Sequence, residues 1–298
     1  MELSIIKNKT LLMKNLRILL LALFILPLIT FSQKDKDSIK EKLERPAYES
    51  SFIIDNPTNV LFNKNALEVT MQHRFGIINT DKNDLAGFWG ASNIRIGLSY
   101  AIHERLTLGF GTTKDNRLQD FNWKVALLRQ TRSNKVPVSI SYYGDFAIDM
   151  RLAKNFLAEQ HRYSYFNQVV IARRFSPNIS LQIAPSISHF NYVTAGMQND
   201  RIAIAFGGRV KISPQTSILF DYSQPITQFD VDPDFPNVDL NLPGISLGVE
   251  FATSAHAFQL FITNLDGIVP QQNYMHNTND FFNGDVLIGF NITRIYNF

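Results

Sequence analysis

Apolar and polar residues alternate with a period of two from Ala66 to the last residue, Phe298. Between Leu67 and Phe75 apolar side chains alternate with glutamate, threonine, glutamine and arginine. Between Ile94 and Ile102 they alternate with arginine, glycine, serine and alanine. This period is that of a β-strand with one apolar and one polar face. The chain after residue 65 is therefore predicted to be all-β.

Twelve runs share this alternation, and most are close to the roughly 9 to 11 residues that a tilted strand needs to cross a bilayer. An even number of antiparallel strands can close without a free edge, which lipid requires because it offers exposed backbone groups no partner. We therefore expect an antiparallel up-and-down transmembrane β-barrel, most simply of twelve strands, over residues 66–298. The runs are 67–75, 94–102, 106–112, 121–130, 136–146, 163–175, 179–190, 201–212, 216–224, 245–253, 256–264 and 285–298.

The connections between these runs alternate strictly between short and long. Outer-membrane barrels have tight periplasmic turns and longer outer loops, so both termini are predicted to lie on the periplasmic side. The short connections are 103–104, 132–135, 176–178, 213–215 and 254–255, and the long ones are 77–93, 113–120, 147–162, 191–200, 225–244 and 265–284.

A soluble barrel with an apolar interior would give the same alternation. The strand number, the small and charged residues of the polar face, and the last strand favour the membrane. Tyr296 and Phe298 share a face in that strand, and a final phenylalanine resembles the signal read by the barrel-assembly machinery. Arg294 interrupts this face and is expected at the headgroup level, where a basic residue costs about 0 to 1 kcal/mol. The expected partners are thus outer-membrane lipid and, during biogenesis, that machinery, and the expected location is the cell outer membrane.

A targeting segment precedes the barrel. Lys14 and Arg17 are followed by an apolar run that is too short for a membrane helix, and small residues at 30 and 32 predict cleavage before Gln33. Residues 1–32 are thus read as a cleaved signal peptide. Met13 is an alternative start, which would leave residues 1–12 as an upstream extension. Residues 33–65 are read as a polar periplasmic segment.

Composition excludes several classes of function. The sequence has no cysteine, which removes disulfides, thiolate metal sites and cysteine nucleophiles. Loss of the signal peptide removes four basic residues and one acidic residue, which leaves equal numbers of each in the rest of the chain. The basic pI therefore gives no reason to expect nucleic acid as a partner.

Charged residues on the polar faces would point into the lumen, with basic residues in excess. A pore that prefers anions is one interpretation, and an internal network of ion pairs that plugs a narrow barrel is the other. The corresponding functions are a passive pore or small-solute transporter and, alternatively, a non-conducting scaffold that binds partners through its long outer loops. The lumen candidates are Glu68, Arg74, Arg95, Lys124, Arg174, Arg209, Asp221 and Glu250.

No catalytic, cofactor-binding or metal site is expected. His73 and His189 fall on apolar faces, as the histidine of a membrane-embedded phospholipase would, but no serine with an orienting partner is predicted beside them. They are read instead as residues of the membrane interface. The aspartates of the loop 225–244 could offer oxygen ligands to calcium, but this loop lacks the glycine of a calcium-binding helix-loop-helix and contains prolines.

Several stretches resemble an uncharacterised family of Bacteroidota outer-membrane barrels, a domain of unknown function. The matching stretches are NPTNVLF (56–62), HRFG (73–76), IRIGLSYAIHERLTLGFG (94–111), KVALLRQ (124–130) and RRFSPNISLQIAPS (173–186). The resemblance spans most of the chain after about residue 52 and implies a barrel in the outer membrane, without an activity. GTT at 111–113 departs from the GRS that the family would have there.

Overall fold

The computed structural model describes residues 41–78, 84–230 and 238–298. The predicted signal peptide, and with it the site of cleavage, lies outside these residues.

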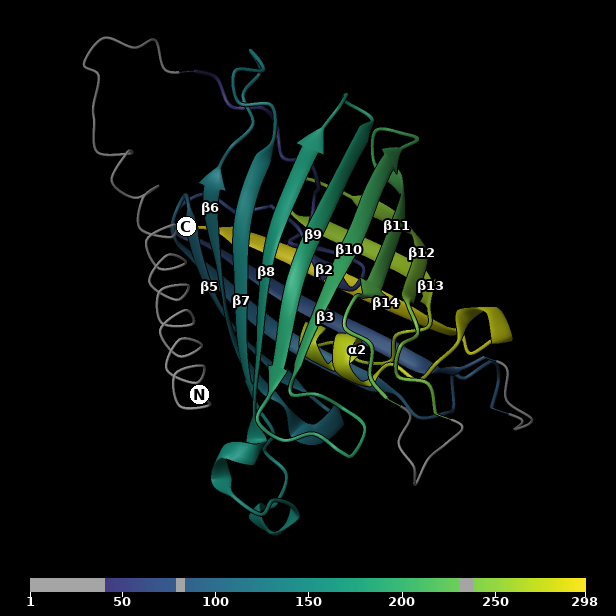
Figure 1. The fold of residues 1–298 in the computed structure, drawn as a ribbon. Helices are drawn as coiled ribbons and strands as arrows, with labels where there is room; N and C mark the ends of the chain where they lie inside the picture. The colour runs from purple at the N-terminus through teal and green to yellow at the C-terminus, as the bar shows by residue number, and fades with distance from the viewer. Residues whose placement is uncertain (1–40, 79–83, 231–237) are drawn as a thin grey trace, which may run out of the picture. The chain divides into compact units, whose positions relative to one another are not determined.

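Twelve antiparallel strands form a closed barrel, in which each strand pairs with its neighbours in sequence and β14 closes on β3 (Figure 1). The predicted fold class is confirmed. Each predicted run overlaps one strand, although the ends shift by a few residues. The strands are β3 (Ala66–Ile77), β4 (Asn93–His103), β5 (Leu106–Thr113), β6 (Gln119–Leu128), β7 (Ser139–Ile148), β8 (Tyr163–Arg174), β9 (Ile179–Phe190), β10 (Asp200–Lys211), β11 (Thr216–Pro225), β12 (Gly244–Ala252), β13 (His256–Thr263) and β14 (Leu287–Asn297).

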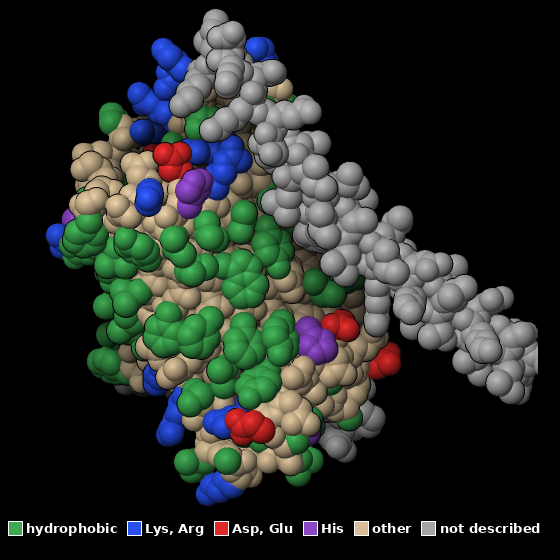
Figure 2. All heavy atoms as spheres, turned by 90° about the vertical axis from the view of Figure 1, so that its left-hand side faces the viewer, with side chains coloured by type: hydrophobic (Ala, Val, Ile, Leu, Met, Phe, Trp, Pro, Cys, Tyr) green, Lys and Arg blue, Asp and Glu red, His purple; other side chains and the backbone are tan. Residues whose placement is uncertain are grey.

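The alternation of the sequence becomes an apolar outside and a polar inside. On β4, Ile96, Leu98 and Ile102 remain more than 40% exposed, whereas Arg95 on the opposite face is buried. Figure 2 shows hydrophobic side chains gathered in a band across one face, with most charged side chains above and below it. Such a band is the surface that a barrel presents to lipid.

We call the two ends of the barrel the turn end and the loop end. The turn end carries 104–105, 129–138, 175–178, 212–215 and 253–255, and the loop end carries 78–92, 114–118, 149–162, 191–199, 226–243 and 264–286. The predicted strict alternation of lengths is wrong at two places. The connection 129–138 is longer than predicted because residues 130–132 pair with the N-terminal segment, through the bridge Leu43–Thr131, and because Pro137 cannot donate to the ladder. The connection 114–118 is shorter than predicted because β6 begins at Gln119.

Two elements are not part of the barrel wall. A short hairpin of β1 (Phe52–Ile53) and β2 (Asn56–Pro57) precedes β3, and helix α2 (Pro270–His276) lies in the connection between β13 and β14. In Figure 1 both lie within the ring of strands. Among the described residues, no helix is long and apolar enough to cross a membrane. The described part of the chain also contains four single turns of 3-10 helix: η1 (Asp115–Arg117), η2 (Ala153–Asn155), η3 (Glu159–Arg162) and η4 (Phe281–Asn283).

Candidate functional site: an occupied lumen

Residues 42–65 run into the barrel from the turn end. The backbone of Glu44 bonds to Gln130 beside the first turn, and Glu49 forms an ion pair with Arg209 at 2.9 Å. The segment then reverses direction in the β1–β2 hairpin, and Asn65 bonds back to the carbonyl of Ala101 at the turn end. We call residues 42–65 the plug. The sequence predicts a polar periplasmic segment here, and the period-two pattern gives no indication that this segment lies inside the barrel.

Asp55 at the tip of the plug is buried and accepts bonds from three strands. Its carboxylate lies 2.8 Å from Arg74 Nη2, 2.5 Å from the Ser246 hydroxyl and 3.3 Å from the Thr263 hydroxyl. The Arg74 guanidinium also lies over the ring of Phe261, 4.5 Å from its centroid. Arg74 is therefore held by the plug and does not face an open path.

Asp221 on β11 holds the same hairpin from the strand beside Ser246, which is its partner across the β11–β12 pair. One of its oxygens accepts the backbone N–H groups of Asp55 and Asn56 at 3.1 and 2.9 Å, and the other accepts the Asn56 side-chain amide at 2.9 Å. Three bonds from one carboxylate fix the turn of the hairpin in one orientation.

Glu68 and Lys124 bind the two arms of the plug. The Ser51 hydroxyl donates to Glu68 at 2.7 Å, and the Lys124 ammonium donates to the carbonyls of Ser51 and Val60 at 3.0 and 3.3 Å. Both side chains are buried. They point into the lumen, and their partners belong to the plug.

Arg95 and Arg209 pair mainly with the wall itself. Arg95 forms a two-pronged ion pair with Asp120, at 2.8 and 2.5 Å, and bonds to Gln72 at 3.0 Å. Arg209 bonds to Glu250 at 3.1 Å as well as to Glu49. Both arginines thus take part in internal ion pairs, as in the alternative to an anion-selective pore.

Arg174 differs from the other candidates. It has the inward parity of β8 but lies at the turn end, where it contacts Glu44 at 3.8 Å and bonds to the carbonyls of Ser176 and Pro177. It belongs to the mouth of the barrel and not to the middle of the lumen.

Apolar side chains fill the space between these polar contacts. Ile53, Ile54 and Val60 of the plug pack with Leu219 and Phe261 of the wall. The Tyr48 hydroxyl donates to the carbonyl of Gly207 at 3.3 Å, and burial, followed by the charge of Asp221, raises the pKa of Tyr48 well above its usual value. Tyr48 thus stays a neutral donor.

Helix α2 closes the lumen from the loop end and meets the plug. The Tyr274 hydroxyl donates to Asn56 Oδ1 at 2.6 Å, and Gln271 Nε2 donates to Asp145 at 2.8 Å. Arg201, fully buried at the start of β10, donates to the Tyr274 carbonyl at 2.7 Å. Burial is the main cause that raises the pKa of Tyr274, so this phenol also remains protonated.

Sequence reasoning missed Asp55, Asn56, Tyr274 and Arg201. One feature of the sequence could have indicated that the plug is buried. The apolar run at 52–54, followed by the turn-forming residues 55–57 (DNP), stands out in a largely polar segment. No comparable signal marks α2, which lies in a loop of mixed composition.

His73 and His189, the two histidines on apolar faces, take part in aromatic and polar contacts. His73 stacks on Phe290, with centroids 5.1 Å apart, and His189 Nδ1 lies 2.7 Å from Asp200 at the loop end. Within the described ranges, no group of three or more histidines and carboxylates could hold a metal ion. Two aspartates of the weighed calcium loop, Asp232 and Asp234, lie outside those ranges.

The last strand places its proposed assembly residues outward and at the turn end. Tyr296 is 37% and Phe298 82% exposed. Arg294 lies opposite His256, the first residue of β13, and its guanidinium is 4.7 Å from the centroid of Tyr296. This position near the strand end is consistent with the headgroup level expected for Arg294.

Solved barrels give the likeness in fold. The COG4313 outer membrane channel from Pseudomonas putida F1 has a TM-score of 0.47 and 10% identity, over 80% of this chain and 97% of that chain. KdgM porin has a TM-score of 0.42 and 7% identity, over 78% of this chain and 99% of that chain. LpxR from Salmonella typhimurium has a TM-score of 0.39 and 11% identity, over 78% of this chain and 100% of that chain.

No curated protein matches the sequence. The family described as a membrane-bound β-barrel domain (DUF5777) matches residues 48–296, which include most of the plug and nearly the whole barrel. A closed, even-stranded barrel with an apolar band outside and charges inside is the architecture of bacterial outer-membrane proteins, and this protein is located in the outer membrane. The resemblance found in the sequence is thus confirmed at the level of the family, whereas the Bacteroidota origin stays a prediction. The chain belongs to the DUF5777 family of membrane-bound β-barrels.

Proposed function

We propose that this protein is an outer-membrane barrel that does not conduct in its resting state and acts as a scaffold that presents its loop end to partners. Of the two functions expected from the sequence, this is the alternative to a passive pore. The observation that carries it is the burial of Asp55, whose carboxylate is bonded to three strands while Asp221 holds the backbone of the same hairpin. A solute would have to displace these bonds and α2 to pass.

Energetics support a closed state. Separating the buried Asp55–Arg74 pair would leave an uncompensated charge in the lumen, which typically costs about 3 to 5 kcal/mol. A cost of this size makes spontaneous loss of the plug a rare event. Loops of 14 to 23 residues at the loop end, such as 149–162 and 264–286, then form a surface available to partners.

The proposal is tested by conductance across planar bilayers. Wild-type protein should insert and give no steady current. In a variant, residues 50–58 are replaced by a glycine-serine segment of the same length and Tyr274→Ala is added, which removes the contacts that close the lumen from both ends. This variant should conduct. A control in which 150–158 are replaced in the same way should stay closed, and steady current through wild-type protein would reject the scaffold proposal.

A gated solute channel is the second candidate, and a specific observation favours it. Among the described residues, no hydrogen-bond partner is within reach of the buried atoms Glu68 Oε1, Gln72 Nε2 and Gln168 Oε1. Buried polar atoms without partners are costly, so the lumen retains polar positions that a displaced plug would expose. Wild-type protein that is silent until a voltage or a ligand is applied would favour this channel over the scaffold.

A further inference from the structure

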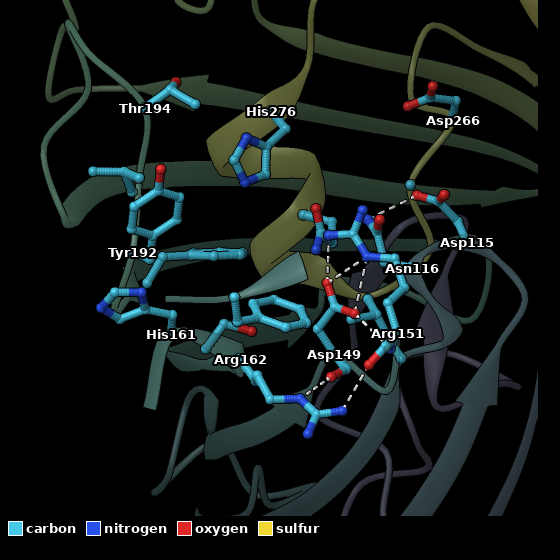
Figure 3. A pocket seen from close by; sticks show the side chains of 17 residues that line it. Asp115, Asn116, Asp149, Arg151, His161, Arg162, Tyr192, Thr194, Asp266 and His276 are labelled. Carbon is cyan, nitrogen blue, oxygen red and sulfur yellow. Dashed lines mark hydrogen bonds and ion pairs between the residues drawn. The ribbon is translucent and has the colours of Figure 1, made fainter. Parts of the chain in front are cut away.

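The loop end contains a hollow of about 320 Å³ that lies apart from the plug (Figure 3). Its walls come mainly from the four connections 114–118, 149–162, 191–199 and 264–286, with Ser164 and Phe190 added from the ends of β8 and β9. Ligand pockets usually measure about 300 to 1,000 Å³, so this hollow has the size for one small molecule. The chemistry of its walls then decides which class of molecule fits.

One wall carries the carboxylates of Asp115 and Asp266, which Figure 3 shows on the same side of the hollow. Asn93 holds their loops together, because its Oδ1 accepts from the backbone N–H of Asp115 and its Nδ2 donates to the carbonyl of Asp266, both at 3.1 Å. Neither carboxylate forms an ion pair with another described residue. The Asp266 side chain reaches solvent, yet partial burial and then the charge of Asp115 raise its pKa.

The opposite wall is aromatic. His161 and Tyr192 stack with their centroids 5.0 Å apart, and Phe190 meets the ring of His276 edge-on at 5.0 Å. In Figure 3, His161 and Tyr192 lie across the hollow from Asp115. Ring faces of this kind attract cations and the apolar faces of small rings.

The two arginines of the hollow are already neutralised. Arg151 forms a two-pronged pair with Asp149, with the shortest contact at 2.6 Å, and Arg162 pairs with Glu159 at 3.1 Å. Both guanidinium groups also lie within 6 Å of the Phe156 ring, at 5.8 and 5.3 Å. Asp115 is also attracted to Arg151, but neither Asp115 nor Asp266 is within ion-pair distance of a described basic residue, so the excess charge of the hollow is negative.

We propose that this hollow binds a small organic ammonium compound. The protonated amine would lie between Asp115 and Asp266, and a ring or apolar part would lie against Tyr192 and His161. An ammonium group donates to carboxylates in strong, charge-assisted bonds, and it relieves the repulsion between the two carboxylates. A neutral ligand would leave this repulsion in place, and an anionic ligand would add to it.

The hollow also shares helix α2 with the closed lumen. Gln272 and His276 line the hollow, while Gln271 and Tyr274 of the same helix contact the wall and the plug. Binding does not require the barrel to conduct, so the binding test stands apart from the conductance test above.

Binding is measured by isothermal titration with the full-length protein in detergent micelles. Glucosamine, glucose and glucuronate are the first three probes, because they share one ring and differ in charge. Tyramine is the fourth and presents an amine with an aromatic ring. We expect glucosamine or tyramine to bind, and glucose and glucuronate to bind at least tenfold more weakly.

The variant Asp115→Asn/Asp266→Asn should lower the affinity for the amine at least tenfold. Asp200→Asn is the matched control, because Asp200 is an exposed aspartate of the same end that contacts His189 outside the hollow. It should leave the affinity unchanged, and circular dichroism should show that all variants are folded. Failure of both amines to bind, equal affinities for glucosamine and glucuronate, or equal losses in the double variant and the control would each overturn the proposal.

Discussion

Asp55 connects the plug to more of the barrel than any other plug side chain described above. Its contacts with Arg74, Ser246 and Thr263 come from three strands, two of which lie about 200 residues away in the sequence. The residue therefore converts a flexible chain segment into part of the interior. At the scale of single residues, the closure of the lumen rests on such carboxylates.

Asp55→Asn should weaken the attachment of the plug because Arg74 would lose its countercharge while staying buried. The loss is expected to be about 3 to 5 kcal/mol, measured as a lower thermal midpoint in detergent and faster proteolysis of residues 42–65. Glu159→Gln is the control, since Glu159 is 64% exposed in its pair with Arg162 and such pairs contribute about 0 to 1 kcal/mol. Equal midpoints for the two variants would contradict this account.

Gly111 makes room for the Arg95–Asp120 pair. A Cβ atom at this position would overlap the guanidinium of Arg95, so Gly111→Ala should displace the arginine and destabilise the barrel by about 1 to 3 kcal/mol. Thermal unfolding in detergent measures the effect. Gly90→Ala, whose Cβ would come no closer than 3.3 Å to its neighbours, should cost less, and the reverse order would refute the steric explanation.

The inward direction of these residues could be read from the sequence, whereas their partners could not. A period of two assigns Arg74, Arg95, Lys124 and Arg209 to one face, because alternation follows from strand geometry. It says nothing about which group lies across the lumen. The partner of Arg74 is Asp55, 19 residues away in a segment without alternation. Without that partner, the excess of basic residues on the polar faces favours an open, anion-selective lumen, whereas the structure places the plug there.

At the scale of elements, the plug and α2 enter the barrel from opposite ends and meet at Asn56 and Tyr274. The hairpin brings apolar Ile53 and Ile54 as well as polar Asp55, and the wall offers a matching mixture in Leu219, Phe261 and Arg74. This match explains why a segment that looked like a polar leader is buried. The strands could be predicted because each follows from a local pattern of residues. The positions of the plug and α2 could not be predicted, because their burial depends on the closed barrel.

A cysteine pair tests whether the plug resides in the lumen. The sequence has no cysteine, and a Cβ atom at Gly207 would lie 3.2 Å from Ile53 Cγ2, so side chains at the two positions would be in direct contact, as the partners of a disulfide must be. Ile53→Cys/Gly207→Cys should form a disulfide on oxidation, detected by peptide mapping. Ile53→Cys/Gly97→Cys should not, since Gly97 faces Thr70 and Arg95. Absence of the first crosslink, or formation of both, would show that the plug lies elsewhere.

At the scale of the whole molecule, the barrel and its twelve strands could be predicted because lipid leaves few options. A membrane-spanning sheet must close, and its outward face must be apolar. The alternation of connection lengths was less reliable, since the N-terminal segment draws residues 130–132 out of the barrel ladder. The overall separation of long loops and short turns nevertheless persists, and it is the basis for an orientation in the membrane.

We expect the loop end to face the outside of the cell and the turn end to face the periplasm, because long outer loops and tight inner turns are typical of outer-membrane barrels. Single cysteines at Asn155 and Val238 report on the loop end, and those at Asn178 and Gln215 report on the turn end. All four positions are exposed. A membrane-impermeant maleimide applied to intact cells should label the first pair alone, and permeabilised cells should allow labelling of all four. Labelling of the turn-end pair in intact cells would reverse the orientation, and with it the side from which the proposed ammonium ligand reaches its hollow.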